Sequence, residues 1–328
     1  MRNKLYPVLL IIGLALVIAI PVALTETKSV EKKSMLELER VLTGHTEGVF
    51  TVAYSPEGQT LASAGQDKTV KIWDMTSGYE IHSLEGHSGL VWSVAYSPDG
   101  SLVASGSDDG LIKLWDPITG EEVRTIDAPS AIWDVVFSPD GKRLASGNDN
   151  ARASLWNVAN GQEIQSLHEH RAQVFVVAFS PDGKMLASGA HDNKIVLWDL
   201  ATYKVIRVLE GHTHLLFTLT FSPNGKTLAS GSFDNTIRLW DATTGIRLNT
   251  LKGHTQWIRS VVYSPNGKII ASGAQDNTIR LWDAATGVEL EKIVAHNHWV
   301  HALSFSPDGT HLASGSLDKT IKIWKVKY

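Results

Sequence analysis

A tryptophan recurs along this 328-residue chain at an almost constant interval. Successive members are 42 residues apart, except for one step of 41 residues. The recurring positions are Trp73, Trp115, Trp156, Trp198, Trp240, Trp282 and Trp324. A fixed period of this length indicates a repeat architecture in which each unit stacks against its neighbours. The fold of the chain therefore follows from the fold of one unit and from the way the units join.

Each unit is predicted to consist of short strands and no helix. Alternating apolar segments such as 102–105 and 111–115 are separated by tight turns, and four strands fit one unit. Seven of the eleven prolines lie in one repeated turn, which is Ser55-Pro56-Glu57-Gly58 in the first copy. Proline presets φ and glycine accepts a positive φ, so each copy is predicted to be a hairpin turn. Because a four-stranded sheet cannot bury both faces alone, the units are expected to stack in a ring.

The two ends of the repeat predict how this ring closes. A typical unit ends with an outer strand such as 288–294, but the chain stops at Tyr328 without such a strand after Trp324. Residues 36–42 match 288–294 in residue character and precede His45 at the register of the other units. We therefore expect them to be the missing outer strand, so that the two ends of the repeat pair in the last unit.

Dipeptides at the two ends of the units carry a resemblance to a known family. Several units open with Gly-His, as at Gly44-His45, and most close with Trp-Asp, as at Trp73-Asp74. Over residues 36–328 the chain resembles the WD-repeat (WD40) family of β-propellers. This resemblance implies an all-β fold, a seven-bladed β-propeller of four-stranded antiparallel blades. It also implies an interaction platform, since the family mostly binds partners.

Apart from the third, each unit also has a Ser ten residues and an Asp six residues before its Trp, with a His upstream. These residue types resemble a catalytic triad, but an active site would not be copied around a ring, whereas every unit needs a buried hydrogen-bond relay. In the family the Asp bonds the His, the His bonds the Ser, and the Ser bonds the indole N–H. The sets assigned to this structural role are His45, Ser63, Asp67 and Trp73; His87, Ser105, Asp109 and Trp115; His170, Ser188, Asp192 and Trp198; His212, Ser230, Asp234 and Trp240; His254, Ser272, Asp276 and Trp282; and His296, Ser314, Asp318 and Trp324.

The third unit departs from this pattern. Asp127-Ala128 replaces Gly-His, Asn150 replaces the Asp, and Trp156-Asn157 replaces Trp-Asp. Two interpretations stay open: tolerated drift, or a specialised and more mobile blade.

Four of the eleven tryptophans lie outside the repeat. They lie three or five residues after the Gly-His position, on sites of the innermost strand that in the family face the top of the ring around its channel. Exposed aromatic clusters mark binding patches, and Trp, Tyr and Arg are the usual hot-spot residues. The predicted partner-binding residues are Phe50, Trp92, Trp133, Phe175, Phe217, Trp257, Arg259, Trp299 and His301, together with Phe233 from the turn before the Asp. The alternative is that these side chains pack against one another and plug the channel mouth.

The first 24 residues predict membrane targeting. Arg2 and Lys4 precede an uncharged run at 5–24, and a helix of that length spans about 30 Å, the thickness of a bilayer core. The length favours an uncleaved transmembrane anchor, with a cleaved signal peptide or a buried helix as alternatives. Residues 25–35 are predicted to be a polar linker. The short acid-free flank favours a membrane-anchored protein with its propeller outside the cytoplasm, or a secreted or periplasmic one after cleavage.

Composition narrows the classes of partner. The formal charge is −4 and no basic block occurs in the body of the chain, so nucleic acid is not an expected partner. Cysteine is absent, which excludes disulfides and thiolate zinc sites. Paired histidines such as His212 and His214 lack a carboxylate cluster, so neither metal nor cofactor is expected.

Three classes of function were compared on this basis. The leading one is a non-enzymatic scaffold that binds a protein or peptide partner through its aromatic top face and is held at the membrane. The alternative is a receptor for a small-molecule or carbohydrate ligand at the channel mouth. An enzyme would need an asymmetric set of polar residues in the channel, and the sequence offers no such set.

Overall fold

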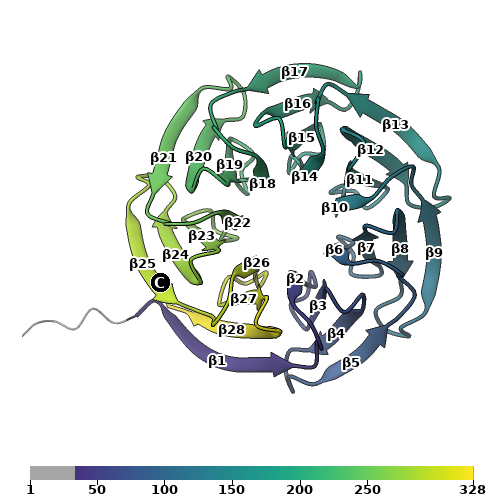
Figure 1. Cartoon of the computed structure of the whole chain (residues 1–328), viewed down its shortest axis with the longest axis vertical. Coiled ribbons are helices and arrows are strands. Elements are labelled where there is room, and N and C mark those ends of the chain that lie inside the picture. Colours follow the sequence, from purple (N-terminus) through teal and green to yellow (C-terminus); the bar gives the residue numbers. More distant parts are fainter. Residues whose placement is uncertain (1–33, 328) are drawn as a thin grey trace, which may run out of the picture. The chain divides into compact units, whose positions relative to one another are not determined.

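Residues 34–327 are described by the computed structural model, and every regular element among them is a β-strand. The strands form seven four-stranded antiparallel sheets, arranged as blades around a central axis (Figure 1). This confirms the all-β, seven-bladed propeller. The anchor or signal segment at 1–24 lies outside the described residues, as does most of the linker. The described residues contain no helix long and apolar enough to cross a membrane.

The blades are numbered along the chain, and their strands follow from the innermost to the outermost. They are β2 (Val49–Tyr54), β3 (Thr60–Gly65), β4 (Val70–Asp74) and β5 (Glu80–Leu84) in blade 1; β6 (Val91–Tyr96), β7 (Val103–Ser107), β8 (Leu111–Trp115) and β9 (Glu122–Asp127) in blade 2; β10 (Ile132–Phe137), β11 (Arg143–Asn148), β12 (Arg152–Asn157) and β13 (Glu163–His168) in blade 3; β14 (Val174–Phe179), β15 (Met185–Ala190), β16 (Ile195–Asp199) and β17 (Lys204–Leu209) in blade 4; β18 (Leu216–Phe221), β19 (Thr227–Ser232), β20 (Thr236–Asp241) and β21 (Arg247–Lys252) in blade 5; β22 (Ile258–Tyr263), β23 (Ile269–Ala274), β24 (Thr278–Asp283) and β25 (Glu289–Val294) in blade 6; and β26 (Val300–Phe305), β27 (His311–Ser316), β28 (Thr320–Val326) and β1 (Leu36–Thr43) in blade 7.

The hydrophobic core lies between neighbouring blades. One cluster joins Val49, Leu61 and Trp73 of blade 1 to Ala313 and Ile321 of blade 7, and all five are buried. Small residues on the second strands let the blades approach this closely. The repeated side-by-side packing is why no single blade is stable alone and why the units form a ring.

The ring closes in blade 7, where the first strand of the described chain pairs with the last (Figure 1). β1 runs antiparallel to β28, with Leu36 opposite Val326 and Thr43 opposite Thr320. The predicted pairing of the two ends is therefore confirmed. Contact with the ring already begins before β1, because the Met35 amide donates to Glu291 at 2.8 Å.

The Ser-Pro turns join the first and second strands of each blade. In blade 1 the Gly58 amide donates to the Ser55 carbonyl at 2.9 Å, and Gly58 has a φ of 72°. The Ser55 hydroxyl oxygen accepts from the Thr60 amide at 3.1 Å. The predicted hairpin turn is confirmed. The loops that precede the inner strands lie at the opposite end of the ring from these turns. We call that opposite end, which also carries the turns between the second and third strands, the top face.

Candidate partner-binding face

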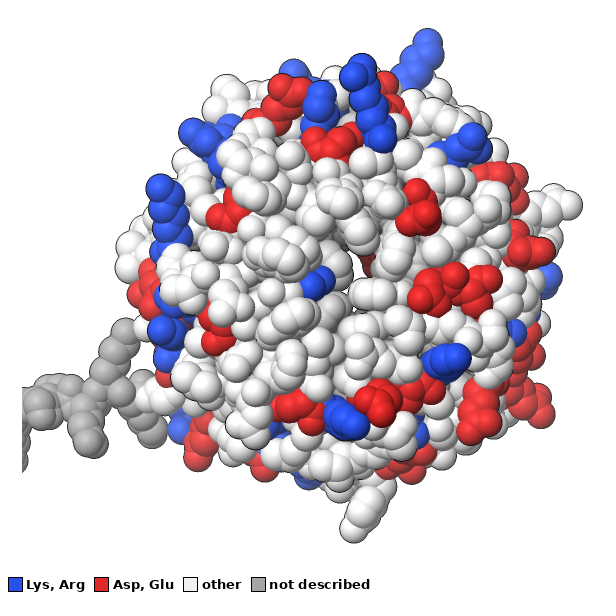
Figure 2. Space-filling view, viewed as in Figure 1, with Lys and Arg blue, Asp and Glu red and all other residues white. Residues whose placement is uncertain are grey.

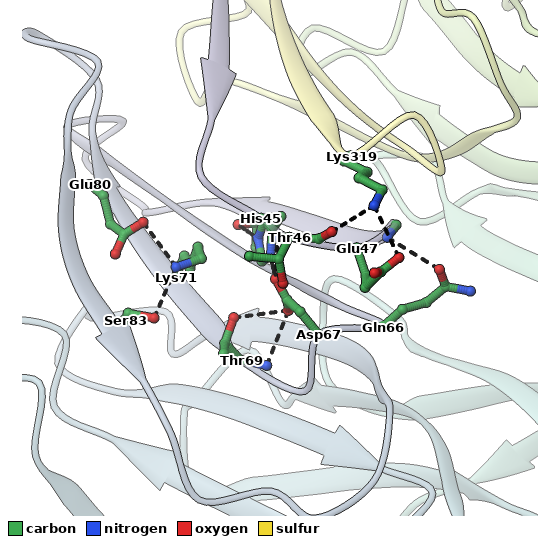
Figure 3. Close-up of polar contacts among 12 residues, drawn as sticks. His45, Thr46, Glu47, Gln66, Asp67, Thr69, Lys71, Glu80, Ser83 and Lys319 are labelled. Atoms are coloured by element: carbon green, nitrogen blue, oxygen red, sulfur yellow. Dashed lines mark hydrogen bonds and ion pairs between the residues drawn. The ribbon is translucent and has the colours of Figure 1, made fainter.

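A buried hydrogen-bond relay lies at the top end of each regular blade. Figure 3 shows the part of the blade 1 relay around His45 and Asp67. In blade 1, His45 Nδ1 lies 2.8 Å from Asp67, and His45 Nε2 lies 2.7 Å from Ser63 Oγ. Trp73 Nε1 donates to the same serine oxygen at 2.8 Å. The remaining five predicted sets make the same contacts, through Ser105, Ser188, Ser230, Ser272 and Ser314.

The electrostatics of the relay are those of a structural unit. Burial opposes ionisation of Asp67, but the hydrogen bond and charge of His45 and the contacts of Thr69 lower its pKa to about 2. The ionised carboxylate therefore accepts the Nδ1–H of His45, and His45 Nε2 is hydrogen-bonded to Ser63 Oγ. Ser63 is fully buried and its oxygen already accepts the indole N–H, so it has no open side for a substrate.

Burial favours the neutral form of four relay histidines. Burial lowers the pKa of each imidazole, and it outweighs the opposing effect of the paired aspartate. The four are His87, His212, His254 and His296. Each ring contacts an aspartate through Nδ1 and a buried serine through Nε2, so the relay ties the loop before the inner strand to the second strand.

Blade 3 contains a different relay in the same place. Trp156 Nε1 donates to Ser146 Oγ at 2.9 Å, and the Ser146 hydroxyl donates to the Asn148 carbonyl oxygen at 2.7 Å. Asn148 Nδ2 then donates to Ser154 Oγ at 3.0 Å. The three polar side chains are fully buried. The sequence analysis did not predict this series of hydrogen bonds. A signal was present, because Asn148 and Ser154 both differ from the residues at the same positions in the other units.

The structure brings all ten predicted partner-binding residues together at the top of the channel. Phe50 stacks on Trp92 with a centroid separation of 4.3 Å, and Trp92 packs edge-on against Trp133 at 5.0 Å. Further ring contacts continue this inner group through Phe175, Phe217 and His301. Mutual packing, the alternative expected from the sequence, therefore describes the inner group.

Phe50 and His301 are the two most buried of the ten predicted residues. Both are buried, and His301 Nδ1 donates to the Phe50 carbonyl at 2.8 Å. Burial and the nearby Arg259 charge lower the pKa of His301 to about 3, so the ring is neutral. Phe50 packs against Trp92, and His301 packs against Phe217.

A second, outer group lies beside blade 6 and consists of Phe233, Trp257, Arg259 and Trp299. Phe233 stacks on Trp257 with centroids 4.0 Å apart. The Arg259 guanidinium lies 4.5 Å from the Phe217 centroid, 4.6 Å from that of Phe233 and 5.3 Å from that of Trp299. Trp257 is 42% exposed, which leaves a large aromatic surface open to solvent. We call these four residues the blade 6 cluster.

A cavity of about 280 Å³ occupies the channel beneath these side chains. Asp134 lies on its wall and was not predicted. Its carboxylate accepts from the Ser93 hydroxyl at 2.7 Å and from the Val177 amide at 2.9 Å. Burial raises the pKa of Asp134 to about 6 despite these hydrogen bonds. No group of three His, Cys, Asp or Glu side chains among residues 34–327 is arranged to hold a metal ion.

Two family profiles match the chain. The profile described as "WDR3 first beta-propeller domain" matches residues 150–326, more than half of the chain. The profile described as "WD domain, G-beta repeat" matches residues 36–74, 78–116 and 120–157. The last of these segments contains much of the irregular third unit, whose relay differs from the others.

Curated relatives match over short segments. A segment of 36 residues is 61% identical to the Periodic tryptophan protein 2 homolog of Dictyostelium discoideum and covers 11% of this chain and 4% of that protein. A segment of 52 residues is 46% identical to Small ribosomal subunit protein RACK1z of Arabidopsis thaliana and covers 16% of each. A segment of 39 residues is 51% identical to Vegetative incompatibility protein HET-E-1 of Podospora anserina, covering 12% of this chain and 3% of that protein.

These alignments cover at most 16% of any of the three relatives, which is a likeness at the level of the repeat. Both profile matches indicate a β-propeller built of WD repeats, and the seven-bladed ring in the structure agrees with them. The chain belongs to the WD-repeat family of β-propeller proteins.

Proposed function

We propose that this chain is a non-enzymatic interaction platform that binds a protein or peptide through the blade 6 cluster. The observation that carries the proposal is the exposure of Trp257, 42% open to solvent and backed by Phe233 and Arg259. An exposed aromatic side chain on a packed base has little conformational entropy to lose on binding and is a typical hot spot. One of the relatives named above adds support, because its name makes it a protein of the small ribosomal subunit, which is an assembly.

A double substitution tests the proposal. Trp257→Ser with Trp299→Ser removes the open aromatic surface and leaves the inner group untouched. The matched control is Ile118→Ser, because Ile118 is 82% exposed on the turn between β8 and β9, away from the channel. Affinity capture with the full chain should recover a partner with wild type and control, but not with the double variant.

Binding constants then decide the matter. For the purified partner we expect the double variant to raise Kd at least tenfold, about 1.4 kcal/mol, and the control to leave Kd unchanged. Thermal unfolding must show the variant folded. Equal affinity of a folded double variant and wild type would overturn the proposal.

A small-molecule or carbohydrate ligand is the second candidate, and the channel cavity of about 280 Å³ favours it. A ligand of that size would slow hydrogen exchange only at backbone amides that line the channel. A peptide would also slow exchange at amides on the top face of several blades. Hydrogen exchange on the complex separates the two, since protection confined to the inner strands would favour the small ligand.

We further propose that residues 5–24 hold the propeller at a membrane, on the side away from the cytoplasm. The support is the uncharged run of 20 residues behind a short basic flank. If the run is cleaved, the product is secreted or periplasmic. Membrane fractionation with N- and C-terminal tags distinguishes these outcomes, and recovery of both tags in the soluble cytoplasm would contradict both.

A further inference from the structure

We infer that the blade 6 cluster recognises a carboxylate, so that the partner is an acidic peptide segment with an apolar side chain beside the acid. This inference rests on the proposed function and specifies the chemistry of its partner. The Arg259 guanidinium lies among four aromatic rings. Distances to the centroids of Phe217, Phe233, Trp299 and Trp257 are 4.5, 4.6, 5.3 and 5.9 Å.

Within residues 34–327, Arg259 has no acidic partner. Burial lowers its pKa to about 10, and no carboxylate offsets that effect. With the Gln275 amide oriented so that its oxygen faces the guanidinium, that oxygen accepts from Nη2 at 2.6 Å and from Nε at 3.1 Å. A neutral amide leaves the positive charge uncompensated, and Nη1 keeps both its donors free of any partner among the described residues. A partly buried guanidinium in this state gains most from a carboxylate, which it can bind through two donors.

The other free polar groups at the channel mouth are also donors. Trp92 Nε1 and Trp133 Nε1 are buried and have no hydrogen-bond partner within residues 34–327. Both indoles line the same cavity as Arg259. Asp134 lies on this wall too, but its oxygens already accept from Ser93, Val135 and Val177. A cavity that is lined by a cation and by unpaired donors favours an acceptor with negative charge and disfavours another cation.

Arg259 also limits what the aromatic rings can bind. A group of aromatic faces without a cation would suit a positively charged ligand through cation–π contact. Here the chain's own guanidinium already occupies those faces, so a lysine or arginine of a partner would meet like charge. Trp257 remains open beside it and can stack on an apolar side chain next to the acid.

Charge on the rest of the top face orients the ligand. In Figure 2 a basic group lies beside the central opening, near β22, and acidic groups lie across the opening, near β7 and β11. Asp108 and Asp149 directly follow those two strands, and both are exposed. An acidic ligand is therefore repelled on the blade 2 and 3 side and drawn towards blade 6.

A peptide selection tests the inference. Random heptapeptides displayed on phage would be selected on the immobilised full chain, and clones that still bind the Trp257→Ser, Trp299→Ser variant would be discarded. We expect the remaining peptides to be enriched in Asp or Glu next to an apolar residue. Synthetic versions with each acid changed to its amide, or with an amidated C-terminus, distinguish a side-chain carboxylate from a terminal one.

Fluorescence anisotropy with these labelled peptides then gives the decisive comparison. On wild type, the acid-to-amide change should weaken binding at least tenfold. On Arg259→Gln the acidic and amide peptides should bind equally, and Arg259→Lys should restore part of the preference. The wild-type comparison needs no variant to fold, so it remains decisive if Arg259→Gln does not.

The possible failures are distinguishable. Peptides that depend on Trp257 but show no acidic enrichment, or that bind wild type as well in their amide form, would overturn the carboxylate inference and leave the proposed function standing. A selection that yields no peptide dependent on Trp257 would overturn both.

Discussion

Asp134 on the inner strand of blade 3 accepts a hydrogen bond at 2.9 Å from the backbone amide of Val177 in blade 4. The same bridge between neighbouring inner strands recurs with hydroxyls in place of the carboxylate. Thr218 Oγ1 accepts from the Val261 amide at 3.1 Å, and Ser260 Oγ accepts from the Leu303 amide at 3.1 Å. Blade 3 alone uses an ionisable side chain for this bridge among the described residues, and that choice makes the interface depend on pH.

The dependence of stability on pH follows from the raised pKa of Asp134. The Asp134 carboxyl has a pKa of about 6 in the folded protein and about 4 in the unfolded chain, so the folded protein binds its proton more tightly. This tighter binding adds to the free energy of unfolding below pH 4, and the contribution is lost as pH rises from 4 to 6. We expect the free energy of unfolding of wild type, relative to Asp134→Asn, to fall by up to about 3 kcal/mol between pH 4 and pH 7. Urea unfolding of both proteins at several pH values in this range measures the difference.

Asp99→Asn is the control for this series. Asp99 is exposed in a Ser-Pro turn, and hydrogen bonds from Ser97 and Ser101 lower its pKa to about 2. Its contribution is lost only below pH 4, so its difference from wild type should stay constant from pH 4.5 to 7. A flat difference for Asp134→Asn as well would show that the Asp134 carboxyl titrates normally.

The two kinds of relay should have similar effects on stability. Ser63→Ala leaves the Trp73 N–H and one His45 nitrogen without partners. Asn148→Ala leaves the Ser146 hydroxyl hydrogen without its acceptor and Ser154 Oγ without its donor. Each orphaned buried group costs about 1 to 3 kcal/mol. We expect both variants to lower the free energy of unfolding by at least that amount in urea titrations. A neutral Asn148→Ala would mean that blade 3 does not depend on its relay.

The regular parts of this molecule were predictable because they are copied. The period of the tryptophans, the turn at Ser55 and the strand-like segment 36–42 each predicted a feature that the structure contains. A repeat gives several independent views of one backbone environment, so the positions that stay constant identify the core without any structure.

The exceptions were not predictable by the same comparison. Asn148 pairs with Ser154 only because both side chains point into one buried space between adjacent strands, and sequence distance does not reveal that direction. Asp134 looked like one polar residue on a variable strand. Its role depends on the Val177 amide, 43 residues away on the next blade. For the aromatic sites the sequence predicted their place, but only the packing separated the buried Phe50 from the exposed Trp257.

Five histidines should remain neutral at pH values just below the ordinary pKa of histidine. Burial lowers the pKa of His87, His212, His254, His296 and His301. The unfolded chain takes up protons on these rings near pH 6.5 while the fold does not, so their contribution to stability is lost as pH falls below that value. Imidazole ¹⁵N chemical shifts at pH 6 should report the neutral form for all five rings. Imidazolium shifts at that pH would contradict the assignment.

Ring closure through β1 should depend on the side chains of β1 that are buried between blades and not on those exposed to solvent. Leu42 is 2% exposed and packs in the cluster that joins blades 7 and 1, whereas Leu38 on the same strand is 47% exposed. Leu42→Ala should lower the free energy of unfolding by about 2 to 5 kcal/mol, because it leaves a cavity at the seam. Leu38→Ala removes the same atoms from a solvated surface and should be close to neutral. Chemical unfolding of the two variants compares them directly. If both substitutions were neutral, packing of β1 would not be what holds the ring closed. The contact between blades 7 and 1 would then depend on the other strands of those blades.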